Sequence, residues 1–182
     1  MNKNQGGRRT KLLISLALYQ LMFKSEYDEI SVKDICDKAR ISRMSFYRYF
    51  TCKDDIFINY CDERFEEFYN DVFSKQNHNV NVEEFVTSIF TFIKKYARQI
   101  NILVKAHKEQ LLSSQFINYA NYIITTTKKN NGDGSKANYL VAAFFAGGLF
   151  NAIMAWMQNG LKETPEDMTR IFKNLIAYNE VS

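Results

Sequence analysis

Residues that interrupt regular structure are scarce in this sequence. The 182 residues include a single proline, Pro165, and only seven glycines. Folds built from many short strands need frequent turn residues, so this composition argues against a sandwich or a barrel. Aromatic residues make up 15% of the chain, which is enough to fill a sizeable core. The composition therefore favours an all-α fold.

Patterns for disulfides, metals and catalysis are also missing. The three cysteines form no CxxC pair, and His78 and His107 stand at no ligand-like spacing from a cysteine. The sequence contains no Ser/His/Asp order of a hydrolase and no glycine-rich phosphate loop. We therefore expect no metal site, no cofactor and no enzymatic activity. Because no signal peptide precedes the first helical segment, we expect a cytoplasmic protein.

Charge is distributed unevenly along the chain. Residues 1–53 contain 11 lysines and arginines against 5 acids, whereas the remainder contains 13 basic and 15 acidic residues. Binding of phosphates by cations releases counterions and drives most nucleic-acid affinity. A positive N-terminal segment on a slightly negative body therefore predicts that a polyanion binds at one end.

The first helix is predicted between a polar arm, residues 1–7, and about Lys24. Tyr27 and Ile30 are expected to dock the turn that follows. The apolar stripe of this helix is predicted to contain Leu12, Leu13, Leu16, Ala17, Tyr19, Gln20, Leu21 and Phe23.

Two short capped helices are predicted next. Ser31, with Asp34 three residues later, indicates a helix over 32–38, and Ser42 indicates a cap for a helix from 43 to about 49. Phe46 and Phe50 lie four residues apart and can face the same core. This pair is a helix-turn-helix candidate within residues 30–50. Its exposed groups suit phosphates and the major groove, and they are Ser42, Arg43, Met44, Ser45, Tyr47 and Arg48.

The rest of the chain is predicted to be helical as well, giving about nine helices in total. We place a DNA-binding domain at 1–53 and a helical effector-binding and dimerisation domain at 54–182. Polar loops are expected at 74–81 and 130–135. The helices of the second domain are expected at about 54–72, 82–97, 100–111, 114–129, 136–159 and 166–178.

Residues 139–157 form a nearly continuous apolar stretch with Asn151 as its only strongly polar side chain. A membrane span is one interpretation, but the stretch is only just long enough and contains two glycines. A helix buried on two sides is the preferred interpretation. Its small residues would let a second helix approach closely, which suits a dimer interface.

The N-terminal pattern resembles the tetracycline-repressor (TetR) family over residues 10–57. The shared positions include Ser31-Val32-x-Asp34-Ile35, Ala39-x-Ile41-Ser42, Phe46-Tyr47-x-Tyr49-Phe50 and Lys53-x-x-Ile56. The family often has glycine where Arg40 and Glu26 stand, both at turns. A looser match from Gly147-Gly148 through Trp156 to Thr164-Pro165-Glu166 resembles a subgroup that includes an activator of dihydroxyacetone-kinase genes.

The resemblance implies roles for the helix-turn-helix residues. Arg43, Met44 and Ser45 would approach base edges, although Met44 is equally well explained as a surface residue. Tyr47 and Lys53 would contact phosphates, and Tyr49 replaces a frequent histidine at a phosphate-facing position. Ser42, Arg48 and Lys33 complete the predicted DNA-binding set.

The resemblance also implies a homodimer held by the last two helices. The predicted interface contains Ala143, Gly147, Phe150, Ile153, Trp156, Ile171 and Leu175. A small-molecule effector pocket is implied because family members commonly have one, with Tyr96, His107, Tyr119 and Tyr122 as candidates, and core packing is the competing explanation for these aromatic residues.

The predicted function is therefore that of a dimeric regulator of the repressor type. It would bind a near-palindromic operator with two recognition helices about 34–36 Å apart. The alternative is a helical module that binds another protein instead of DNA. The sequence reveals neither the operator nor the effector nor the regulated genes, and nothing in it distinguishes repression from activation.

Overall fold

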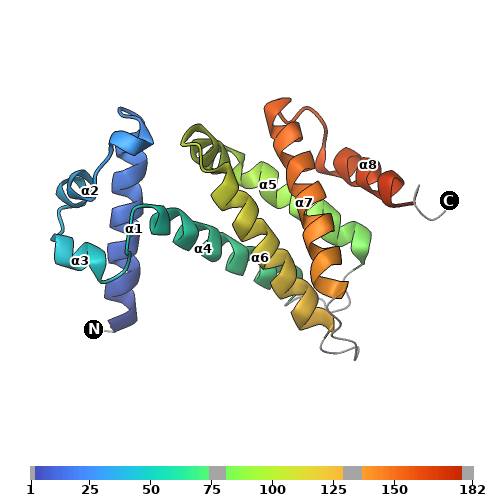
Figure 1. Ribbon diagram of the computed structural model, residues 1–182, viewed down its shortest axis with the longest axis horizontal. Helices are drawn as coiled ribbons and strands as arrows, with labels where there is room; N and C mark the ends of the chain where they lie inside the picture. Colours follow the sequence, from blue (N-terminus) through green and yellow to red (C-terminus); the bar gives the residue numbers. More distant parts are fainter. Residues whose placement is uncertain (1–2, 74–80, 129–136, 178–182) are drawn as a thin grey trace. The chain divides into compact units, whose positions relative to one another are not determined.

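The computed structural model describes residues 3–73, 81–128 and 137–177, all of them in helices or short connections (Figure 1). This part of the chain contains no strand, in agreement with the all-α prediction. One 3-10 helix, η1 (Tyr27–Glu29), accompanies the α-helices, which are α1 (Lys3–Met22), α2 (Val32–Ala39), α3 (Arg43–Tyr47), α4 (Asp54–Phe73), α5 (Val82–Lys105), α6 (Glu109–Lys128), α7 (Ala137–Gln158) and α8 (Pro165–Ala177).

The chain divides into two compact units, Met1–Glu63 and Arg64–Ser182. The boundary falls inside α4, whereas the sequence analysis divided the chain at residues 53 and 54, where α4 begins. The first half of α4 thus belongs to the N-terminal unit, and the second half belongs to the C-terminal unit.

The N-terminal unit is built on α1, against which α2 packs, with α3 packed on α2 (Figure 1). Its core contains buried side chains from every helix, including Ile14 and Leu18 of α1 and Ile56 and Phe57 of α4. The predicted stripe of α1 was largely on the wrong face, because Leu12, Leu16 and Phe23 are exposed. Burial of the Ile14 face leaves these side chains on the opposite side of the helix.

The start of α1 also differs from the prediction. Residues 3–7 were expected in a flexible arm, but the helix begins at Lys3. The hydroxyl of Thr10 donates a hydrogen bond to the carbonyl of Gly6 at 2.9 Å within this first part of the helix. Residues 1–2 lie outside the described part of the chain.

The C-terminal unit is a helical bundle in which α6 packs along α7 and α5 packs along α8 (Figure 1). Its core joins Phe68 of α4, Phe90 of α5, Ile153 and Trp156 of α7, and Met168 of α8. The predicted break between helices 82–97 and 100–111 is absent, because α5 runs without interruption from Val82 to Lys105. Most of the predicted connections at 74–81 and 130–135 lie outside the described residues.

The apolar stretch at 139–157 forms most of α7. Ala146, Leu149, Ile153, Met154 and Trp156 on this helix are buried within the bundle. Among the helices described, none has the length and apolar character that crossing a bilayer requires.

Candidate nucleic-acid interface

Helix α2 supports the candidate interface and is fixed at both ends. At its start, the Ser31 hydroxyl accepts a hydrogen bond from the Asp34 amide at 3.2 Å, and the Asp34 carboxylate accepts one from the Ser31 amide at 2.9 Å. The Ser31 hydroxyl also donates to the Asp34 carboxylate at 2.5 Å, and this hydrogen bond together with the one from the Ser31 amide holds the pKa of Asp34 below its ordinary value. Ile35 and Cys36 point into the core, which leaves Lys33 exposed. The capping box predicted from the sequence is confirmed.

The turn after α2 contains a residue in the left-handed region. Arg40 has φ 55° and ψ 47°. The amide of Ile41 donates to the carbonyl of Cys36 at 3.1 Å, and the amide of Arg40 donates to that of Asp37 at 3.3 Å. This pair of hydrogen bonds is a Schellman motif, in which the left-handed position is usually glycine. The turn geometry is therefore retained although an arginine occupies that position.

Helix α3 has one apolar and one polar side. Its cap is Ser42, whose hydroxyl accepts a hydrogen bond from the Ser45 amide at 3.1 Å. Phe46 is 0% exposed, and Phe50, just after the helix, is 3% exposed. Their ring centroids lie 5.7 Å apart. The two phenylalanines anchor this five-residue helix to the core, as the sequence predicted.

The opposite side of α3 presents the predicted contact residues to solvent. Met44 is 77% exposed and Tyr47 is 57% exposed, and Arg43 and Arg48 are exposed as well. Within the described residues, neither arginine makes a salt bridge or a side-chain hydrogen bond. An unpaired cation beside a large exposed aromatic and an exposed thioether is an arrangement suited to phosphates and base edges.

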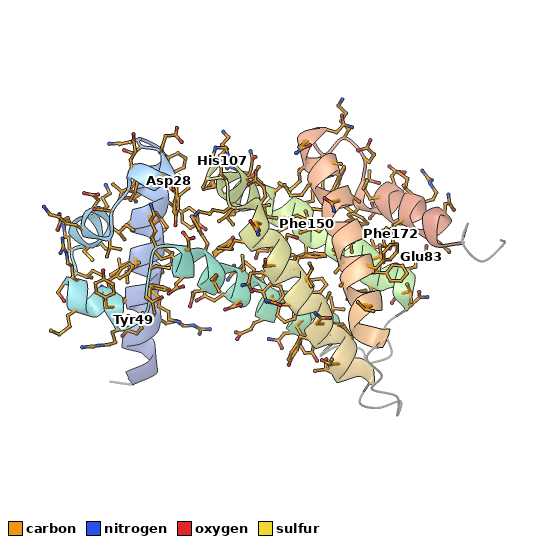
Figure 2. All side chains as sticks on the ribbon, viewed as in Figure 1. Asp28, Tyr49, Glu83, His107, Phe150 and Phe172 are labelled. Carbon is orange, nitrogen blue, oxygen red and sulfur yellow. The ribbon has the colours of Figure 1, made fainter. Side chains whose placement is uncertain are left out.

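Two of the predicted DNA-binding residues make contacts within the N-terminal unit. Ser45 is half-buried, and its hydroxyl lies 3.0 Å from that of Ser42. Tyr49 is half-buried against α1, since a β-carbon on Gly7 would lie 3.4 Å from Tyr49 Cε1 (Figure 2). A β-carbon at position 7 would make ordinary van der Waals contact with the ring, so Tyr49 packs on the start of α1. The sequence analysis missed this contact, because only the fold brings residues 7 and 49 together.

Lys53 is held by the turn around η1. Its amine donates to the carbonyl of Tyr27 at 2.6 Å and to that of Ile30 at 3.0 Å. The same nitrogen lies 4.1 Å from the centroid of the Tyr27 ring. The Tyr27 hydroxyl is hydrogen-bonded to Asp54, and burial together with this carboxylate raises the pKa of Tyr27. Lys53 thus ties the start of α4 to the turn, whereas the sequence analysis expected its amine at a phosphate.

The four candidate effector residues fall in three separate places. Tyr96 donates to both oxygens of Glu67 at 2.7 Å, in a cluster that also contains Arg64 and Lys95. The hydrogen bonds from Lys95 and Tyr96 lower the pKa of Glu67. His107 is exposed at the turn between α5 and α6 (Figure 2).

Tyr119 and Tyr122 share an aromatic cluster between α4 and α6. The Tyr119 ring stacks on Phe65 with centroids 4.2 Å apart and an interplanar angle of 5°. Tyr122 meets Phe65 edge-on at 5.8 Å and Tyr69 at 5.5 Å. Tyr122 is 49% exposed, so one side of this cluster is open to solvent.

The predicted dimer residues are also divided. Ile153 is 2% exposed and Trp156 is 3% exposed, both inside the core of their own unit, where Trp156 meets Phe90 edge-on at 5.6 Å. Phe150 is half-buried and its ring lies 5.9 Å from that of Phe116 on α6. Burial within the subunit takes these three side chains largely away from an outer surface.

The remaining predicted dimer residues are more accessible. Ala143 and Gly147 are half-buried, and Ile171 is 47% exposed. The side chain of Leu175 lies outside the described part of the chain. On the same helix, Lys173 forms a 2.6 Å salt bridge with Glu83 of α5.

A further exposed side of α7 was not among the predicted dimer residues. Leu140 is 68% exposed and Phe144 is 76% exposed. Gly148, Asn151 and Ala155 continue the same side of the helix and are exposed. A β-carbon on Gly148 would meet no described atom within 4 Å. We call these five residues the outer face of α7.

Family models match both units of this chain. The model for bacterial regulatory proteins of the tetR family matches residues 16–60, and a TetR-type model for a transcriptional regulator C-terminal region matches residues 80–178. The second match covers more than half of the 182 residues. No curated protein sequence gives a significant match.

Solved structures share the fold. A TetR transcriptional regulator from Streptococcus agalactiae 2603V has a TM-score of 0.67 at 19% identity, covering 96% of this chain and 97% of its own. A putative TetR-family regulator from Syntrophomonas wolfei has a TM-score of 0.61 at 17% identity, with 99% and 97% covered. The dihydroxyacetone kinase operon activator DhaS has a TM-score of 0.56 at 18% identity, with 93% and 95% covered.

Proposed function

Because this chain belongs to the TetR family of transcriptional regulators, we propose that it represses transcription by binding a near-palindromic operator as a homodimer. The observation that carries the proposal is the polar side of α3. Arg43, Met44 and Tyr47 are exposed on a helix that two buried phenylalanines fix to the unit. Because the backbone of α3 is already fixed, only its side chains need to be ordered on binding DNA, which reduces the entropic cost of binding.

The exposed residues divide between the two kinds of DNA contact. Arg43 and Met44 lie in the first turn of α3 and would reach base edges, with the Ser45 hydroxyl beside them. Tyr47 and Arg48 near the end of the helix, and Lys33 on α2, would contact phosphates. Tyr49 would add its hydroxyl at the edge of the interface. Lys53 would contribute by holding the η1 turn against α4.

The outer face of α7 supports the proposed dimer. Leu140 and Phe144 expose large apolar side chains there, and Ile171 of α8 exposes a third. Glycine inside a helix costs about 1 kcal/mol relative to alanine. At Gly148 no described atom of the same subunit would contact an added β-carbon, so packing within the subunit does not require glycine there. The close approach of a helix from a second subunit gives that glycine a function. The dimer would place two α3 helices on successive major grooves about 34–36 Å apart.

A small-molecule effector would bind at the aromatic cluster between α4 and α6. Tyr119 and Tyr122 are the two predicted residues that the structure brings together, and the half-exposed Tyr122 leaves an open edge. Aromatic walls of this kind suit an apolar ring or chain. Binding there would act on the second half of α4, the helix that continues into the N-terminal unit.

Footprinting of the DNA upstream of the gene, followed by transcription in vitro, tests this function. The wild-type protein should protect a near-palindromic site and lower transcription from the adjacent promoter, and its affinity should fall steeply with salt. The combined change of Arg43→Ala and Tyr47→Ala should weaken operator binding about 100-fold or more.

A change at Val82, an exposed residue on α5, provides the control. Val82→Ala should bind the operator as the wild type does, since this side chain is 70% exposed in the C-terminal unit and belongs to no predicted DNA contact. Absence of any protected site, together with capture of a protein partner by the N-terminal unit, would establish the alternative of a protein-binding module. Higher transcription on operator binding would contradict repression.

A further inference from the structure

The turn between α2 and α3 holds a cation in a conformation that arginine adopts at a cost. We propose that Arg40 binds a phosphate of the operator backbone and that its backbone strain is retained for this contact. The inference rests on the proposed DNA binding and adds a residue to it. A non-glycine residue in the left-handed region is disfavoured by contact between its Cβ and the following carbonyl oxygen.

The turn geometry at position 40 requires only backbone hydrogen bonds and no particular side chain. The Schellman hydrogen bonds at this turn are donated by the amides of Arg40 and Ile41, and glycine supplies the same amide without the strain. The end of α7 shows this solution in the same chain. There Gly160, at φ 81°, and Leu161 donate to Met157 and Trp156 in the same pattern. The turn geometry therefore does not explain the arginine at position 40.

Interactions inside the protein do not explain the arginine either. Arg40 is exposed. Within the described residues its guanidinium makes no salt bridge and no side-chain hydrogen bond. The left-handed conformation is not unique to this turn, because His107 ends α5 at the same φ of 55°. What distinguishes Arg40 is the combination of this strain with an exposed guanidinium that has no partner in the described residues and lies within the helix-turn-helix.

The location of Arg40 identifies the class of partner. It stands two residues before Ser42, the cap of α3, and three residues before Arg43. Arg43 and Arg48 flank the polar side of α3, so Arg40 extends a positive surface beyond the start of the helix. An arginine between the two helices of a helix-turn-helix lies beside the DNA backbone when α3 enters the major groove. The guanidinium group binds phosphate oxygens bidentately.

Three variants and one assay test this inference. Operator affinity is measured by fluorescence anisotropy from about 0.05 to 0.3 M salt. Arg40→Gly should raise the unfolding temperature by about 2–4 °C, because strain is removed, and should weaken binding about 10-fold. The slope of log affinity against log salt should become shallower by about 0.9 for each arginine removed, or about 1.8 for a dimer. The loss should be equal for the operator and for single-base variants of it, since phosphate contacts carry no sequence information.

The other two variants separate charge from turn geometry. Arg40→Lys keeps the charge and the strain, so it should retain the wild-type salt slope. Lys24→Gln removes an exposed cation at the end of α1 and should leave affinity and slope unchanged. Wild-type affinity and slope in Arg40→Gly would overturn the inference, as would equal losses in Arg40→Gly and Arg40→Lys. Either result leaves the proposed function intact if the wild type protects its operator, whereas a wild type that binds no DNA refutes the proposed function itself.

Discussion

Truncation of Phe144 tests whether the outer face of α7 forms the dimer. Phe144 is 76% exposed in the subunit, so about three-quarters of its surface is available for burial by a partner. Burial of a whole phenylalanine side chain is worth about 1.5–3 kcal/mol. Phe144→Ala should therefore cost about 1–2 kcal/mol in each subunit. A two-fold dimer loses this contribution twice, so its dissociation constant should rise about 30- to 1,000-fold.

Sedimentation equilibrium measures this change directly, and the unfolding temperature of the subunit provides a second readout. Phe144→Ala should leave monomer stability near that of the wild type, because the side chain is largely exposed in the subunit and its ring meets that of Phe145 on the same helix. Trp156→Ala is the contrasting variant, since it opens a cavity in the subunit core and should cost about 3–5 kcal/mol of stability. Val82→Ala should change neither quantity. A dissociation constant for Phe144→Ala within threefold of the wild-type value would refute the assignment of this face.

Two further predictions concern the helix ends and are checked by thermal and denaturant unfolding. His107, at φ 55°, ends α5 in a Schellman motif, so His107→Gly should stabilise the protein by about 0.5–1 kcal/mol. Gly160 has φ 81°, so Gly160→Ala should destabilise the protein by about 1 kcal/mol. The strain argument would be contradicted if both changes stabilised the protein or both destabilised it. Hydrogen bonds from Ser31 lower the pKa of Asp34, so its contribution to stability is complete above the ordinary aspartate pKa and is lost as pH falls through the lowered one. In Asp34→Asn, the free energy of unfolding should therefore fall less steeply as the pH is lowered. If the pH dependence is the same as in the wild type, the capping box does not cause it.

Local cap signals in the sequence predicted the starts of α2 and α3. Ser31 and Ser42 cap α2 and α3, and Thr164 caps α8 by accepting from the Asp167 amide at 3.1 Å. A cap depends on side chains only three residues apart, so the sequence contains all of the information. The positions of Phe46 and Phe50 in the core followed from a spacing of four residues, which is also local. These features were sufficient to locate the polar side of α3.

The faces of the apolar helices were not predictable in this way. In α1 and α7, apolar residues occur on nearly all sides, so periodicity does not identify the side that faces the core. Leu16 was therefore expected in the core but is exposed, and Trp156, expected at a dimer interface, is buried in the core of its own subunit. The contacts of Lys53 with Tyr27 and Ile30 span more than 20 residues and depend on how α4 meets the η1 turn. No local pattern contains that information.

The shortness of α3 links DNA binding to the stability of the whole N-terminal unit. A helix of five residues does not form alone in water, because isolated helices shorter than about 12–15 residues are marginal even with favourable sequences. The positions of Arg43 and Tyr47 therefore depend on the burial of Phe46 and on the turn at Arg40. A substitution at Phe46 would weaken binding by unfolding the support, whereas one at Arg43 would weaken it with the fold intact. Operator affinity alone does not separate these causes, so each DNA-binding measurement on this unit requires an unfolding measurement on the same variant.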